Sequence, residues 1–145
     1  MNGGDNSLDF GGPTDKWGPP PVVGEANGMA GRAVVVRPAH VDDGLSNTYL
    51  LGEKYVNPDH YADGLDLGDN ENAYVGSDRD TLRHHLKPSR DRSMYDNSYA
   101  FGSAHPGVFQ MALGDGSVQS ISFTIDTEIH EALIRRNDGQ VVGNL

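Results

Sequence analysis

The sequence predicts an α+β fold, with a small antiparallel sheet, long loops and a C-terminal helix. Two apolar runs, residues 108–113 and 118–125, flank a Gly-Asp-Gly-Ser turn and indicate a β-hairpin. An acidic residue follows this hairpin and precedes apolar residues at helical spacing. The chain also contains 19 glycines and 8 prolines among 145 residues, so loops should form much of it.

The chain divides into an irregular Gly/Pro-rich segment, residues 1–30, and a globular domain, residues 31–145. Phe10 and Trp17 are the only large apolar anchors of the first segment. Two long polar stretches, residues 55–76 and 78–96, are expected to form loops. Loops of this length are uncommon unless contacts with the rest of the domain hold them in place. Strands are expected at residues 32–36 and 48–51, with a short one at residues 73–75.

The register of the hairpin follows from its apolar side chains. With a two-residue loop, Ile121 would lie on the sheet face opposite Phe109 and Met111. A three-residue loop instead pairs Phe109 with Ile121 and Met111 with Gln119, so that the apolar side chains share one face. We therefore expect the loop to be residues 114–116, with Gly116 in the left-handed conformation of a G1 bulge.

The helix is expected to begin after Asp126, a good N-cap, with Glu128 in the first turn. Its apolar stripe should consist of Ile129, Leu133 and Ile134. Arg135 and Arg136 are expected in the last turn, and the Asn-Asp-Gly sequence at residues 137–139 should end the helix. The tail, residues 140–145, should add a short edge strand through Val141 and Val142.

The net charge of −10 argues against a nucleic-acid partner, which needs a basic patch. The absence of cysteine excludes disulfides and thiolate metal sites. No apolar run approaches the roughly 18 residues that span a bilayer, so no membrane span is expected in this chain. The acidic, Gly-rich N-terminus is also unlike a signal peptide.

One acidic loop is a candidate metal site, because it carries four carboxylates among glycines. Calcium binds roughly six to eight oxygen ligands in flexible geometry, although the spacing here is not that of an EF-hand. A solvated acidic loop without a metal is the alternative interpretation. The candidate Ca²⁺ ligands are Asp63, Asp66, Asp69 and Glu71.

No group of residues in the sequence predicts a catalytic site, so we expect that the protein is not an enzyme. A strand between His105 and Asp115 would span roughly 20 Å, which places the two side chains at opposite ends and prevents a His–Asp dyad. The other histidines are scattered or adjacent, which is unfavourable for joint metal ligation. A hydrolase that uses His105 or His60 with nearby acids is the remaining enzymatic alternative.

Several motifs together resemble those of a known family. His105, nine residues and then Asp115-Gly116 match the H-X9-DG signature of the DUF1559 proteins, which are pseudopilin-like and abundant in planctomycetes. The segment at residues 41–54, VDDGLSNTYLLGEK, is similar to the DG-x-SNT-x-x-x-GE segment of that family. Shorter similar segments bring the coverage to roughly residues 33–142.

The resemblance implies a pilin-like architecture, residence in the cell envelope or outside the cell, and a non-enzymatic role in a type II secretion-like or pilus-like assembly. The implied partners are other pilin-like subunits or proteins of the secretion machinery. The hydrophobic N-terminal helix of the family is not present in this sequence, so the match is to the globular region. The alternative function is a calcium-binding surface or glycan-binding module that uses residues 63–71.

Overall fold

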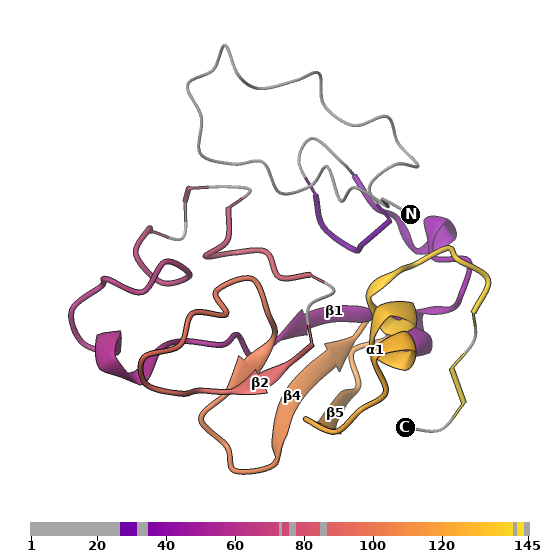
Figure 1. The fold of residues 1–145 in the computed structure, drawn as a ribbon. Coiled ribbons are helices and arrows are strands. Elements are labelled where there is room, and N and C mark those ends of the chain that lie inside the picture. The colour runs from indigo at the N-terminus through magenta and orange to yellow at the C-terminus, as the bar shows by residue number, and fades with distance from the viewer. Residues whose placement is uncertain are drawn as a thin grey trace.

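A computed structural model describes residues 27–31, 35–72, 74–75, 78–84, 87–140 and 142–143. Its centre is a three-stranded antiparallel sheet in the order β1-β4-β5 (Figure 1). The strands are β1 (Tyr49–Gly52), β4 (Val108–Leu113) and β5 (Val118–Ser122), and the helix α1 (Thr127–Ile134) follows them. Long loops connect these elements. The predicted α+β class is therefore confirmed.

The β4–β5 hairpin has the register that its apolar side chains predict. Phe109 pairs with Ile121 and Met111 pairs with Gln119, which leaves three residues in the loop. Gly116 has a φ of 87°, in the left-handed region that glycine adopts without a steric cost. The side chains of Phe109, Met111 and Ile121 are buried, as expected for one shared face. The side-chain pattern was therefore sufficient to fix this part of the fold.

The hydrophobic core lies between the sheet and α1. Phe109 is fully buried and its ring stacks on Phe123, with the ring centroids 5.5 Å apart. His130 of α1 is also fully buried and packs against the ring of Tyr49. The buried apolar cluster consists of Tyr49, Phe109, Met111, Leu113, Ile121 and Leu133.

The N-terminus of α1 is capped as predicted. The Asp126 carboxylate accepts hydrogen bonds from the backbone N–H groups of Glu128 and Ile129, at 2.8 and 3.4 Å. Ile129 is 39% exposed, however, and the buried face of the helix is formed by His130, Ala132 and Leu133. The predicted stripe was therefore correct for Leu133 and for Ile134, which packs against the core, but wrong for Ile129.

The C-terminus of α1 lies earlier than predicted. The helix ends at Ile134, and the backbone is already extended at Arg135, with a ψ of 145°. Arg135 and Arg136 therefore lie beyond the helix rather than in its last turn. The N–H of Arg136 instead donates to the carbonyl of Asn27 at 2.8 Å, and its guanidinium donates to the carbonyl of Gly28 at 2.6 Å. These bonds attach the segment before residue 31 to the end of α1.

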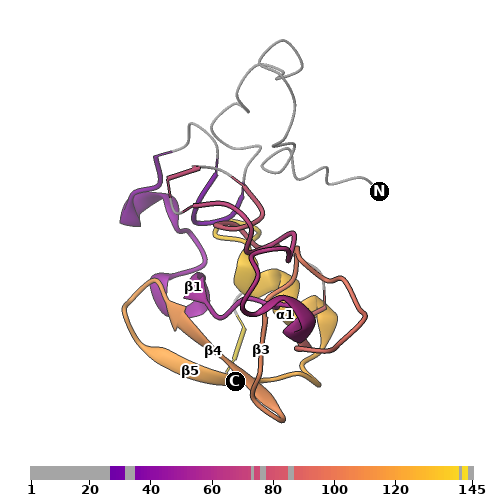
Figure 2. The same ribbon diagram turned by 90° about the vertical axis from the view of Figure 1, so that its left-hand side faces the viewer.

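A second sheet has only two short strands and was not predicted. β2 (Ser89–Arg90) pairs with β3 (Gly102–Ser103) in parallel, and β2 lies within residues 78–96, which we expected to be a loop. Figure 2 shows β4 between β5 and β3. The pairing forms because the chain turns back towards the main sheet after residue 90. This places β3 next to the end of β1, where the N–H of Gly102 donates to the carbonyl of Glu53 at 3.0 Å.

Three other expected strands lie only partly within the described residues. Residues 35–36 form no strand, and residues 74–75 form an exposed turn; the neighbouring residues 32–34 and 73 lie outside the described part of the chain. Val142 packs against the core without forming a strand, and Val141 lies outside the described residues. The predicted anchors Phe10 and Trp17, within the segment 1–30, lie outside them as well.

Candidate functional site: a polar loop network beside the sheet

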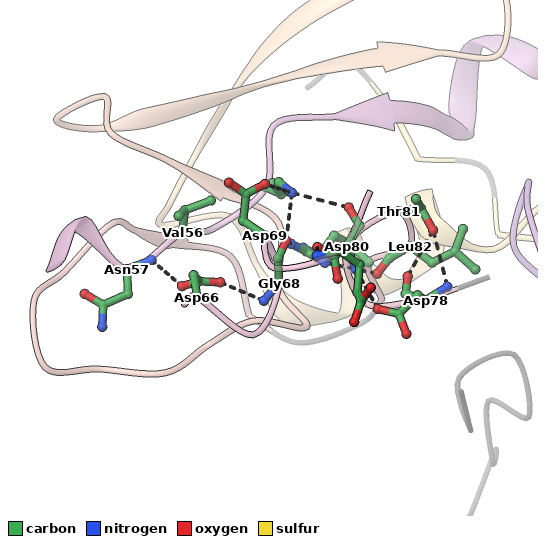
Figure 3. A network of polar contacts seen from close by, with 12 residues as sticks. Val56, Asn57, Asp66, Gly68, Asp69, Asp78, Asp80, Thr81 and Leu82 are labelled. Carbon is green, nitrogen blue, oxygen red and sulfur yellow. Dashed lines mark hydrogen bonds and ion pairs between the residues drawn. The ribbon is translucent and has the colours of Figure 1, made fainter. Parts of the chain in front are cut away.

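The acidic loop folds against the segment at residues 78–84 through a network of polar contacts (Figure 3). The ammonium group of Lys54, just after β1, is at its centre. It donates to the carbonyl of Gly68 at 2.7 Å and to the Asp69 carboxylate at 2.5 Å, and it lies 3.4 Å from the carbonyl of Asp80. One lysine therefore joins the end of β1 to two parts of the loop region, residues 68–69 and residue 80.

Asp66 is the buried carboxylate of this network, with only 4% of its surface exposed. Its two oxygens accept hydrogen bonds from the backbone N–H groups of Asn57 and Gly68, both at 2.7 Å. Buried carboxylates are costly unless such donors compensate them. Asp66 therefore fixes the start and the middle of the loop relative to each other.

Arg83 supplies a second cation. Its guanidinium donates to the carbonyl of Gly68 at 3.0 Å, so that this carbonyl accepts from both Lys54 and Arg83. Burial lowers the pKa of Arg83 to about 10, which still leaves the side chain charged at neutral pH. A side chain on Gly68 would meet this guanidinium, since a Cβ there would lie 2.6 Å from it. The glycine thus allows the close approach of the cation.

The four predicted calcium ligands lie in different environments. Asp66 binds backbone N–H groups, Asp69 binds Lys54, and Asp63 binds His60 at 3.0 Å. The hydrogen bond to Asp63 raises the pKa of His60, and the same bond lowers the pKa of Asp63. At Glu71, the backbone N–H donates to the Asp80 carboxylate at 2.9 Å.

These carboxylates are not brought together into a metal site. Within the part of the chain that the structure describes, no group of three or more His, Cys, Asp or Glu side chains could hold a metal ion. The physical reason is that other side chains of the chain itself already bind two of these carboxylates: the Lys54 ammonium pairs with Asp69, and the His60 ring hydrogen-bonds to Asp63. Calcium binding by residues 63–71 stays a hypothesis that the geometry does not support.

Removing the Asp66 side chain tests the network. We expect Asp66→Ala to lower the free energy of unfolding by about 2 kcal/mol, because two backbone N–H groups lose a charged acceptor in a buried position. Urea unfolding followed by circular dichroism would measure the change. Asp69→Ala is the control: its side chain is 50% exposed in the ion pair, so its loss should cost about 0.5 kcal/mol. Equal effects of the two substitutions would contradict the role of Asp66.

The H-X9-DG residues lie at the two ends of β4. The ring of His105 lies 3.3 Å from a Glu53 carboxylate oxygen, and the other oxygen of Glu53 accepts from the backbone N–H of Gln110 at 2.7 Å. Glu53 thus joins the end of β1 to β4 and to the loop that holds His105. This carboxylate was missed by the sequence reasoning, although it directly follows β1.

Asp115 stabilises the hairpin loop at the other end of the strand. It accepts hydrogen bonds from the hydroxyl and the backbone N–H of Ser117, at 2.7 and 2.9 Å, and these bonds lower the pKa of Asp115. His105 and Asp115 have separate partners and make no contact with each other, as the length of β4 predicts. Gly116 follows in the left-handed conformation. All three signature residues therefore have structural roles at turns.

Residues 3–128 match a family model described as a protein of unknown function, DUF1559. The chain belongs to the DUF1559 family. This confirms the family that the sequence motifs indicate. Searches among curated proteins and among solved structures find no match to this DUF1559 chain.

Further polar contacts fix the remaining loops of the DUF1559 chain. Tyr55 is fully buried, and its hydroxyl lies 2.9 Å and 2.6 Å from the carbonyls of Arg92 and Tyr95. The Asp59 carboxylate accepts from the hydroxyl of Ser93 and from the N–H of Met94, at 2.7 and 2.8 Å. The loops after β1 and β2 are therefore bound to each other. The described residues contain no helix that is long and apolar enough to cross a membrane.

Proposed function

We propose that this DUF1559 chain is a non-enzymatic structural or assembly module of a pseudopilin-like protein. The system would be type II secretion-like or pilus-like, located in the cell envelope or outside the cell. Its partners would be other pilin-like subunits or proteins of the secretion machinery, rather than nucleic acid.

The observation that carries this proposal is the position of the signature residues. His105 and Asp115 lie at opposite ends of one strand, where each stabilises a turn or loop next to the sheet. A reaction centre requires its acid and base within hydrogen-bond distance of a shared substrate, and this pair is not arranged in that way. The residues that identify the family thus support the shape of the domain, as expected for a module whose function is to present a surface.

The fixed loops support the same proposal. Asp59, Asp66 and Lys54 each join segments that are separated in the sequence, so the loop surface is largely ordered before a partner binds. Preformed surfaces lose less conformational entropy on binding than mobile ones. The alternative, a calcium-dependent or glycan-binding module, has no comparable support from the contacts of residues 63–71.

Site-specific photo-crosslinking in the cells that make the protein would test the proposal. A photoreactive residue at Met94, which is 94% exposed, or at Leu65, which is 65% exposed, should form adducts with pilin-like subunits that mass spectrometry identifies. The same residue at the buried Met111 is the control and should form none. A chain found only in the cytosol, without adducts to envelope proteins, would contradict the proposed role.

A further inference from the structure

The outer edge of β5 presents backbone groups that no other strand of the described residues covers. β5 is the last strand of the sheet order β1-β4-β5. The N–H of Phe123 donates to the carbonyl of Gly107, and the carbonyl of Ser117 accepts from Leu113. Along an antiparallel strand, the backbone groups of successive residues point alternately to one side and the other. The odd-numbered residues of β5 therefore form the backbone hydrogen bonds to β4. The N–H and C=O groups of Val118 and Ser120 therefore point outward, and no hydrogen bond from the described residues reaches them.

This edge lacks the usual features that prevent strand addition. Edge strands of soluble proteins commonly carry a charge, a proline or a bulge. β5 has the sequence VQSIS and pairs with β4 in continuous register, so it has none of these. β1, at the other edge, does have a register shift between Tyr49 and Leu51. The two edges of the same sheet therefore differ, and only β5 is a regular template.

A groove lies directly beside this edge, between β5 and α1. Apolar side chains from the turn, the helix and the tail contribute to it, and Asp126 is part of its wall. Ile129, which does not reach the core, is 39% exposed and lines this groove. The apolar lining residues are Ile121, Ile125, Ile129 and Val142. An added strand could place alternate side chains in this groove.

The charges around the groove indicate the chemistry of its partner. Residues 106–134 contain no lysine or arginine, and they contain four acidic residues, Asp115, Asp126, Glu128 and Glu131. Asp115 and Asp126 lie before and after β5. Antiparallel pairing with β5 of a second copy would bring Asp126 of one copy towards Asp115 of the other, and like charges across strands are destabilising. The acidic residues that precede and follow β5 instead favour a basic partner.

We propose that the β5 edge binds an extended segment of another protein chain, in which basic residues flank a short run of alternating apolar residues. The segment adds to the sheet as a fourth strand, through hydrogen bonds to Val118 and Ser120, with its basic ends beside Asp115 and Asp126. This inference rests on the proposed assembly role, because it names the surface and the kind of partner that such a module would use.

The test uses a synthetic peptide in which valine and threonine alternate between terminal lysines, titrated into the full chain and followed by NMR and calorimetry. We expect binding with shifts centred on the amides of Val118 and Ser120. Ser120→Pro removes the outward N–H without removing a bond to β4, and should weaken binding about tenfold or more. Ser120→Ala is the matched control, since both variants lose the hydroxyl that contacts Gln110, and it should bind like the unmodified chain.

The outcomes separate this inference from the proposed function. Three results would overturn the edge site. The first is equal binding of the peptide by Ser120→Pro and Ser120→Ala. The others are equal binding of a peptide with glutamates in place of the lysines, and no binding at all. A dimer in ultracentrifugation that Ser120→Pro dissociates would make a second copy the occupant and would also overturn it. Peptide binding without adducts to pilin-like subunits in cells would support the edge site and reject the assembly role.

Discussion

Replacing Phe109 with alanine is expected to lower the free energy of unfolding by about 3–5 kcal/mol. The ring is fully buried near the start of β4, stacks on Phe123 and lies 6.0 Å from the ring of His130. Its removal leaves a cavity between the sheet and α1 that the surrounding side chains fill only in part. Domains are typically stable by about 5–15 kcal/mol, so the variant should melt at a much lower temperature. Calorimetry or thermal circular dichroism would measure the change.

Val118→Ala in the same hairpin is the matched control. Val118 is 66% exposed, so its truncation should change the free energy of unfolding by no more than about 0.5 kcal/mol. If Phe109→Ala cost as little as Val118→Ala, the core would not lie between β4 and α1. The comparison therefore tests the arrangement of the sheet and the helix.

Gly102→Ala is expected to lower the free energy of unfolding by about 3 kcal/mol, at the upper end of the usual cost of overpacking. A Cβ at this position would lie 2.2 Å from the carbonyl oxygen of Ser89 and 3.0 Å from the Cα of Tyr55. Both neighbours are constrained, because Ser89 pairs with Gly102 in the short parallel sheet and Tyr55 is fully buried. The strands β2 and β3 must separate to accept the methyl group. Hydrogen exchange should become faster at the amide of Asp91, which bonds to Ser103.

Gly107→Ala provides the comparison for Gly102→Ala, since a Cβ on Gly107 meets no atom within 4 Å. Its effect should lie within about 0.5 kcal/mol. A similar loss of stability in both variants would contradict the contact with Ser89 as its cause, because Gly→Ala by itself reduces the entropy of the unfolded chain and does not destabilise. Unchanged exchange at Asp91 in Gly102→Ala would contradict the parallel pairing.

The hairpin and the start of the helix could be predicted because their signals are local. The parity of Phe109 and Ile121 allows only one register with a buried apolar face, and Asp126 satisfies N–H groups two and three residues away. The glycine at position 116 provides the left-handed residue that the three-residue loop requires. None of these features depends on distant parts of the chain.

The parallel β2–β3 pair and the loop network could not be predicted, because their contacts join distant residues. Glu53 reaches Gln110 across 57 positions, and Lys54 reaches Asp80 across 26. Acidic side chains at residues 63–71 resembled metal ligands because the sequence does not show which cation lies beside them. One signal was present: Lys54 is the only lysine between Lys16 and Lys87, and it lies three residues after the predicted strand at residues 48–51.

The most direct test of the central structural claim, that Lys54 and Arg83 close the loop network without a metal, is a melting curve with excess calcium and with EDTA. A ligand at about 100 times its Kd stabilises a protein by roughly 2.7 kcal/mol, which is a shift of several degrees. We expect the melting temperature to be the same in calcium and in EDTA, for the unmodified chain and for Asp69→Ala. A melting temperature that rises with calcium, and that no longer rises in Asp69→Ala, would contradict the claim and support the calcium-binding alternative.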